Sequence, residues 1–192
     1  MPHPNIPVLE FLHSRRSRPA KTLKAPAPTR DALRPILQAA LRCPDHGKLE
    51  PWRLIVLERA ALKRLADLVA ACGARLGRDD ADITKATDQF ANSPLAVAVI
   101  EVQKPAAKVP PIEQSYSAGA ACLGLLNAAL ASGWGANWLS GWVSHDREFL
   151  QTGLQLEPHE RLAGFIHIGT ETSAPPERPR PDMDKITTWM AN

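Results

Sequence analysis

The sequence is poor in cysteine, with three among its 192 residues and no C-x-x-C pair. Cys43, Cys72 and Cys122 are odd in number and lie far apart, so their spacing indicates neither a disulfide framework nor a zinc site. We therefore expect no metal centre. We also expect the chain to work in a reducing compartment, the cytoplasm.

Long hydrophobic runs and a leader segment are lacking as well. The most apolar run, 118–131, contains Asn127 and is shorter than the roughly 20 residues that a membrane-spanning helix needs. The opening Met1-Pro2-His3-Pro4 has neither the charged nor the apolar region of a signal peptide. The sequence therefore predicts a soluble protein that has no membrane partner.

Charge of one sign is nowhere concentrated. The 23 lysines and arginines are interspersed with 20 aspartates and glutamates, which leaves a formal net charge of +3. Because nucleic-acid binding surfaces need a continuous basic patch, a nucleic-acid partner is not favoured. A basic interaction module remains the lowest-ranked alternative, and it would show a steep salt dependence of binding.

The motifs of common hydrolases, metalloproteases and nucleotide-triphosphate enzymes are missing. The chain has no H-E-x-x-H, no G-x-S-x-G and no G-x-x-x-x-G-K-[ST]. The pair Gly133 and Gly135 supplies only part of a dinucleotide fingerprint. These patterns give us no candidate catalytic residue and no metal ligand.

Helical and strand patterns alternate along most of the chain. The strand at 95–102 is apolar throughout, which is typical of a central strand covered on both faces. The alternation predicts a single domain in which helices cover both faces of a sheet. We expect helices at 8–16, from Thr29 or Asp31 to 41, at 60–76, 79–90, 113–132 and 144–150, and strands at 52–58, 95–102, 133–139 and 163–169.

The C-terminal segment 171–192 differs in composition from the rest. It begins with a Pro-rich stretch, 175–181, that cannot form a helix or a central strand, and it ends with Ile186, Trp189 and Met190. The apolar end needs a surface on which to dock. A disordered end and an arm that crosses onto a partner are equally compatible with this pattern.

Two polar segments can bind an anion. Arg15 and Arg16 offer planar guanidinium donors and Ser17 adds a hydroxyl, so together they could hold a phosphate, although cations at a helix C-terminus are also explained by the helix dipole. In the loop before the strand at 52–58, His46 follows Arg42 by one turn. Their donors could converge on phosphate or carbonyl oxygens.

Taken in order, these segments resemble the nitroreductase family, and its small YdjA-like branch in particular. The resemblance covers nearly the whole chain. It implies an α+β, nitroreductase-like FMN-dependent fold with a mixed central sheet and helices on both faces, and a homodimer with FMN at the subunit interface. The segments that carry it are Arg15-Arg16-Ser17, Arg42 to Arg53, Gln114 to Ala120, Trp138-Leu139-Ser140-Gly141 and Gly164 to Thr170.

The resemblance also implies a set of cofactor-binding residues. One departure concerns Leu139, because the family often has arginine there, and its loss could weaken FMN binding or make room for substrate. Arg178 and Arg180 resemble phosphate-side basic residues, and the segment 127–132 matches the expected nicotinamide-binding segment. The FMN contacts carried over by position are Arg15, Arg16, Ser17, Arg42, His46, Trp138, Leu139 and Ser140.

The implied activity is that of an NAD(P)H-dependent nitroreductase. Hydride from NADH or NADPH passes to flavin N5 and then, by a ping-pong mechanism, to a nitroaromatic, quinone or related small molecule, with no side chain needed as acid, base or nucleophile. On this reading, residues 1–170 form the flavin-binding domain and 171–192 an arm that docks on the partner subunit. The alternatives are another reductive reaction on the same fold, or a flavin-binding or sensing protein with little turnover.

Overall fold

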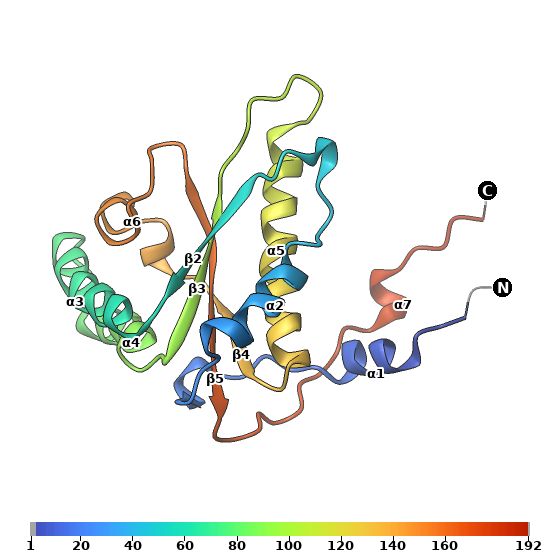
Figure 1. Cartoon of the computed structure of the whole chain (residues 1–192), viewed down its shortest axis with the longest axis horizontal. Coiled ribbons are helices and arrows are strands. Elements are labelled where there is room, and N and C mark those ends of the chain that lie inside the picture. The colour runs from blue at the N-terminus through green and yellow to red at the C-terminus, as the bar shows by residue number, and fades with distance from the viewer. Residues whose placement is uncertain (1–2, 192) are drawn as a thin grey trace.

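A five-stranded sheet forms the middle of the computed structural model, which describes residues 3–191 (Figure 1). The strand order is β1-β5-β3-β2, and β4 also pairs with β5. The strands are β1 (Leu23–Lys24), β2 (Trp52–Leu57), β3 (Leu95–Glu101), β4 (Gly135–Leu139) and β5 (Arg161–Glu171).

The expected α+β fold is confirmed, but the sheet within one chain differs from the expected mixed sheet. All four pairings among residues 3–191 are antiparallel. The connection between β2 and β3 gives the reason. Two helices lie between these strands, so the chain returns to the end of the sheet at which it left and runs back in the opposite direction.

Helices cover both faces of the sheet, as the sequence predicts. Figure 1 shows α2 and α5 on one face and α3, α4 and α6 on the other. The helices are α1 (Ile6–Ser14), α2 (Arg30–Ala40), α3 (Arg59–Arg75), α4 (Asp80–Ala91), α5 (Pro111–Ala131), α6 (Arg147–Leu154) and α7 (Met183–Ile186).

Side-chain caps fix where several helices begin. The Thr29 hydroxyl accepts a hydrogen bond from Ala32 N at 3.3 Å, so Thr29 rather than Asp31 caps α2. Asp146 accepts from Phe149 N at 3.0 Å and caps α6. That helix therefore begins later than the sequence pattern suggested.

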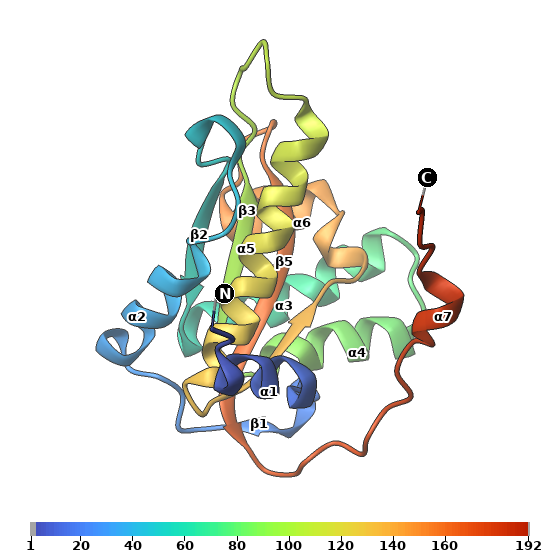
Figure 2. The same ribbon diagram turned by 90° about the vertical axis from the view of Figure 1, so that its right-hand side faces the viewer.

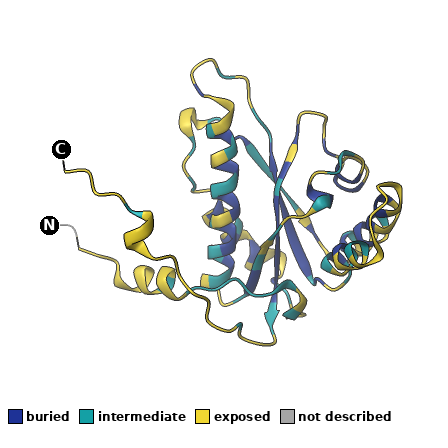
Figure 3. Ribbon diagram, turned by 180° about the vertical axis from the view of Figure 1, so that it is seen from behind, coloured by how far each residue is buried: buried dark blue, intermediate teal, exposed yellow. Residues whose placement is uncertain are grey.

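Strand β3 separates two hydrophobic clusters, and every one of its residues is buried. Ala96, Ala98 and Ile100 face the cluster beneath α3, α4 and α6, whereas Val97 and Val99 face α2 and α5. This burial confirms the central strand expected from its unbroken apolar run. Figure 3 shows the buried middle of the sheet between helices whose outer surfaces are exposed.

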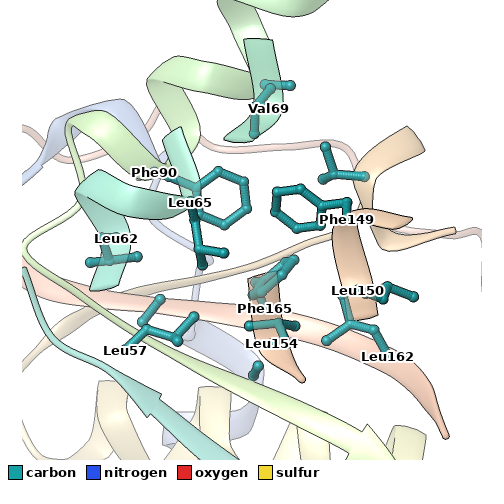
Figure 4. Close-up of a cluster of buried hydrophobic side chains, with 14 of the residues drawn as sticks. Leu57, Leu62, Leu65, Val69, Phe90, Phe149, Leu150, Leu154, Leu162 and Phe165 are labelled. Carbon is teal, nitrogen blue, oxygen red and sulfur yellow. The ribbon is translucent and has the colours of Figure 1, made fainter. Parts of the chain in front are cut away.

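Three phenylalanines fill the centre of the first cluster (Figure 4). The rings of Phe90 and Phe165 lie edge to face with centroids 5.1 Å apart, and Phe149 lies 5.7 Å from Phe90. All three side chains are fully buried. Aromatic pairs in this geometry contribute about 0.5–1.5 kcal/mol beyond the burial of their area, so these contacts fix α4 and α6 against β5.

Small residues let α2 approach α5 closely. A Cβ added at Gly124 would lie 3.0 Å from the carbonyl oxygen of Ala40, whereas one added at Gly119 would meet no atom of the chain within 4 Å. Gly124 thus permits the close packing of α5 on α2 in the interior. Gly119 lies on the outer face of α5, where no other segment among residues 3–191 covers it.

Helix α1 and the C-terminal segment project together from one side of the body (Figures 1 and 2). Helix α1 buries none of its residues, and the apolar side chains near its start and in the C-terminal segment are exposed, Trp189 to 89%. No helix among residues 3–191 has the length and apolar character needed to cross a membrane.

Candidate functional site

A cluster of guanidinium groups lies where the chain leaves α1. Arg15, Arg16 and Arg18 line a cavity of about 270 Å³ beside the C-terminal end of α5. The Arg15 Nη2 donates to the Ser17 hydroxyl at 3.0 Å. Its Nε is buried and has no hydrogen-bond partner within residues 3–191. Burial and the nearby Arg180, Arg16 and Arg18 lower the pKa of Arg15, so the site favours an anion.

The segment after α1 runs beside β4 and brings two of the predicted segments together. Arg18 N donates to Ala136 O at 2.8 Å, and Asn137 Nδ2 donates to Arg18 O at 2.7 Å. These bonds hold Ser17 next to the strand that carries Trp138 and Leu139. No spacing pattern in the sequence indicates this contact, because about 120 residues separate the two segments.

Neighbouring residues of β4 point to opposite faces of the sheet. Trp138 packs over Gly164, where a Cβ would lie only 2.0 Å from its indole Nε1, and it is 37% exposed. Leu139 and Ser140 instead line a groove on the α4 side. The three residues expected to act as one segment therefore serve two different surfaces.

That groove holds about 900 Å³. Such a volume falls within the range for organic cofactors and ligands. Besides Leu139 and Ser140 it is lined by Asn137, by Lys21 in the connection after α1, and by polar side chains of α4 that include Lys85 and Gln89. The sequence analysis missed all four of these residues. For Lys85 and Gln89 the reason is that the polar face of a helix shows the same pattern whether it meets solvent or a ligand.

The second polar loop is fixed to the other end of α5. His46 Nδ1 lies 2.5 Å from Glu113 Oε2, and the Ser117 hydroxyl donates to Pro44 O at 2.7 Å. Asp45 accepts from two backbone N–H groups farther along the loop, at 3.1 and 2.8 Å. These bonds hold the loop along the N-terminal half of the helix.

One chain does not bring all the predicted binding residues together. His46 contacts Glu113 in the first turn of α5, whereas Arg15 lines a cavity with Leu130 in its last turn. At about 1.5 Å per residue these positions are roughly 25 Å apart along the helix. Arg42 is exposed and makes no side-chain hydrogen bond or ion pair within the described part of the chain.

The C-terminal segment reaches the guanidinium cluster. Arg16 Nη1 donates to Pro176 O at 2.6 Å and lies 3.2 Å from Glu177 Oε1. Arg180 Nη2 lies 3.2 Å from the same carboxylate oxygen. Arg180 is therefore the tail arginine that joins the cluster, whereas the guanidinium of Arg178 forms no ion pair among residues 3–191.

The segment expected to meet nicotinamide, 127–132, forms the end of α5. Leu130 lines the cavity beside Arg15, and the buried Oδ1 of Asn127 has no hydrogen-bond partner among the described residues. The segment thus adjoins the cationic cluster. Within residues 3–191, no group of three histidine, cysteine, aspartate or glutamate side chains could hold a metal ion.

The chain is similar in sequence to bacterial proteins over most of its length. The chain is 34% identical over 162 residues to "Putative NAD(P)H nitroreductase YdjA" of Escherichia coli (strain K12), an alignment that covers 84% of this chain and 87% of the relative. It is 36% identical to a protein of Haemophilus influenzae with a similar name, again over 84% of this chain and 87% of the relative.

Solved structures show the same fold. A nitroreductase-like family protein from Bacillus cereus superposes with a TM-score of 0.80 at 23% identity, over 100% of this chain and 99% of the other. A nitroreductase with bound FMN from Bacteroides fragilis gives 0.74 at 20% identity, over 95% and 98% of the two chains. The model of the "Nitroreductase family" matches residues 12–170. The chain therefore belongs to the nitroreductase family.

Proposed function

We propose that this protein is an FMN-dependent oxidoreductase that uses NADH or NADPH to reduce a nitroaromatic, a quinone or a related small molecule. The observation that carries the proposal is the cationic cluster at the end of α1. It holds a buried Arg15 Nε without a partner among the described residues, and it adjoins a groove large enough for a ring system. Family membership and the FMN named for solved members of the fold add support.

The residues present fit a phosphate at the cluster. Arg15 and Ser17 would hold it, with Arg16 and Arg180 able to turn toward it from the exposed side. A charge-assisted hydrogen bond contributes about 1.5–3 kcal/mol, so two or three such bonds account for much of micromolar cofactor binding.

The groove between β4 and α4 fits the ring system. Its apolar wall includes Leu139, and the cations that line it are Lys21 and Lys85. These two lysines share the groove with the carboxylates of Asp80 and Asp88, and they can donate hydrogen bonds to ring oxygens in place of the arginine that the family often has at position 139. Loss of that arginine is therefore compatible with flavin binding in this chain.

FMN, when bound, supplies the N5 position that accepts hydride from NAD(P)H and passes it on to the acceptor in a second half-reaction. The chain's own side chains bind and orient rings, and none of them is required as acid, base or nucleophile. Asn137 and Ser140 offer hydrogen bonds at the rim of the groove. Trp138 offers an aromatic surface on the opposite face of the strand.

We further propose a homodimer in which α5 packs against a second copy. Ile112, Tyr116, Gly119 and Leu123 follow one another at spacings of four, three and four residues, and Tyr116 is 68% exposed. Residues spaced in this way form one helix face, and Gly119 leaves room on it for another backbone. Such a face is typical of a helix that packs against another helix.

A second copy also solves the problem of the separated residues. His46 lies roughly 25 Å from Arg15 when distance is taken along α5, so these two residues could share one cofactor only across a subunit interface. We propose that the arm 171–192 docks on the partner there and buries Trp189. Three unpaired cysteines favour the cytoplasm as the place of action.

The test is FMN binding followed by anaerobic reduction. Wild-type protein is titrated with FMN by fluorescence, and then NADH or NADPH is added and the flavin absorbance near 450 nm is followed. We expect retention of FMN and bleaching by one pyridine nucleotide. Bleaching that no acceptor reverses would favour a sensing protein, and a wild-type protein that binds no FMN would refute the proposal.

The Arg15→Ala variant tests the phosphate site. We expect FMN affinity to fall roughly ten- to a hundredfold with the fold intact, because a charge-assisted hydrogen bond and a buried charge are lost. Arg34→Ala is the matched control, since Arg34 is exposed on α2 and remote from the cluster. Equal affinity in Arg15→Ala and wild type would remove Arg15 from the site.

A further inference from the structure

A histidine lies fully buried in the sheet beside the groove. His167 belongs to β5 and has no exposed surface. Its ring lies near Phe90 and Phe165, with centroids 6.2 and 6.4 Å away. Burial lowers the pKa of His167 to about 4, so the imidazole is neutral at pH 7. A neutral imidazole has one donor and one acceptor nitrogen.

The hydrogen bonds around His167 determine which nitrogen carries the proton. The Ser93 hydroxyl donates to Leu95 O at 3.0 Å, and His167 Nδ1 lies 2.9 Å from the Ser93 oxygen. Because a hydroxyl has a single proton, the Ser93 oxygen must accept from His167. His167 is therefore protonated on Nδ1, and its Nε2 carries a lone pair.

That lone pair in turn orients Gln89. The Gln89 amide nitrogen lies 3.3 Å from His167 Nε2, and only an N–H group can satisfy a lone pair. Gln89 is half-buried and lines the groove. Its amide oxygen takes part in no hydrogen bond within residues 3–191. The carboxamide is thus held with its nitrogen toward the sheet, which leaves the oxygen as an acceptor for the groove.

The surroundings match one edge of a flavin ring. The imide edge of a flavin presents the N3–H donor between two carbonyl acceptors, so its complement is an acceptor between donors. Gln89 supplies the acceptor, and Lys85 and Lys21 supply donors to the same groove. Asp88, the neighbouring acceptor on α4, accepts from Asn92 Nδ2 at 3.3 Å.

We propose that Gln89 is a specificity-determining residue that accepts a hydrogen bond from the flavin N3–H, and that His167 is the positioning residue that holds its amide in this orientation. The inference rests on the proposed function. The inference adds to the proposed function a contact from α4 to the flavin. It also adds a chain of hydrogen bonds, here called the relay, that runs from Leu95 O through Ser93 and His167 to Gln89.

The first experiment compares two cofactors. The protein is titrated with FMN and with 3-methyl-FMN, in which a methyl group replaces the N3 hydrogen. We expect wild type to bind FMN up to roughly tenfold more tightly, as loss of one hydrogen bond and an unsatisfied acceptor imply. We call the Kd for 3-methyl-FMN divided by the Kd for FMN the methyl ratio. In Gln89→Leu, which keeps a similar volume without the acceptor, we expect this ratio to approach one.

Variants of His167 test positioning. His167→Leu is expected to lower the methyl ratio, because the Gln89 amide then has no hydrogen-bond partner that fixes its orientation. His167→Gln is expected to preserve it, because a glutamine oxygen can take the place of Nε2 and accept from Gln89. A ratio in His167→Leu equal to that of wild type would overturn the positioning role, and so would loss of the ratio in both variants.

A measurement without flavin covers the case in which His167→Leu does not fold. Imidazole ¹⁵N NMR of the wild-type protein at pH 7 is expected to show the Nδ1–H tautomer, and the Nε2–H tautomer would overturn the relay. FMN binding with the same ratio in wild type and Gln89→Leu would overturn this inference alone. Failure of the wild type to bind either flavin would overturn the proposed function with it.

Discussion

The neutral, buried state of His167 makes the stability of this protein sensitive to acid. In the unfolded chain a histidine titrates near 6.5, whereas burial lowers the pKa of His167 to about 4 in the folded protein. Between these values the unfolded state binds more protons, so stability must fall as pH falls. Desolvation alone causes the shift, which agrees with a ring that faces Phe90 and Phe165 rather than a charge.

The magnitude follows from the separation of the two pKa values. A difference of roughly two to three pH units corresponds to about 3 kcal/mol once pH has fallen through both values. Between pH 7.5 and pH 5.0, where the folded state stays neutral at this position, the expected loss is about 2 kcal/mol. That is a large part of the 5–15 kcal/mol by which domains are usually stable.

The assay is urea unfolding of wild type and His167→Gln at pH 7.5 and pH 5.0. Unfolding is monitored by far-UV circular dichroism at one protein concentration. The carboxylates and the other histidines titrate in both proteins and cancel in the comparison. We expect wild type to lose about 2 kcal/mol more than the variant over this range. If the loss of unfolding free energy in wild type exceeded that in the variant by less than about 0.5 kcal/mol, the view that burial holds His167 neutral would be refuted.

Two further predictions concern the proposed dimer interface and the Trp138 indole. Gly119→Glu puts a charge on the open face of α5 and should turn a dimer into a monomer in sedimentation experiments. Ala70→Glu, on the exposed side of α3, should leave the dimer intact, and a monomeric wild type would contradict the proposed dimer. Gly164→Ala should displace Trp138, whose Nε1 lies 2.0 Å from the added Cβ position, and should shift its fluorescence, which an unchanged emission spectrum would contradict.

Most of the fold could be predicted from the sequence because its signals are local. The apolar run of β3 and the periodicity of α3 and α5 depend on neighbouring residues, and their bounds agree with the structure to within a few positions. Strand β1 was missed. It has only two residues, Leu23 and Lys24, and it exists through pairing with Glu171 and Thr170 nearly 150 positions away.

The site was predictable only in part, for the same reason. Arg15 to Ser17 form a compact motif, and the structure brings them beside β4. The α4 side chains of the groove carry no motif, since only tertiary placement separates Gln89 from a solvated glutamine. His167 did leave a signal, because one histidine interrupts an otherwise apolar strand at 163–169.

The charge balance of the cluster bears on which anion it selects. The cluster holds the guanidiniums of Arg15, Arg16, Arg18 and Arg180. Against these four positive charges the chain places two carboxylates, since Glu171 lies 2.7 Å from Arg18 and Glu177 lies 3.2 Å from both Arg16 and Arg180.

The remaining charge of about +2 matches a phosphate monoester, which carries about −1.5 to −2 at pH 7, better than a single carboxylate. Of the two acidic residues, Glu171 is half-buried at the end of β5, whereas Glu177 belongs to the exposed tail and can move away from the cluster. A bound phosphate would therefore compete with Glu177 rather than with Glu171. If it displaced Glu177, the cluster would present a charge of about +3 to the phosphate, while Glu171 stayed paired with Arg18.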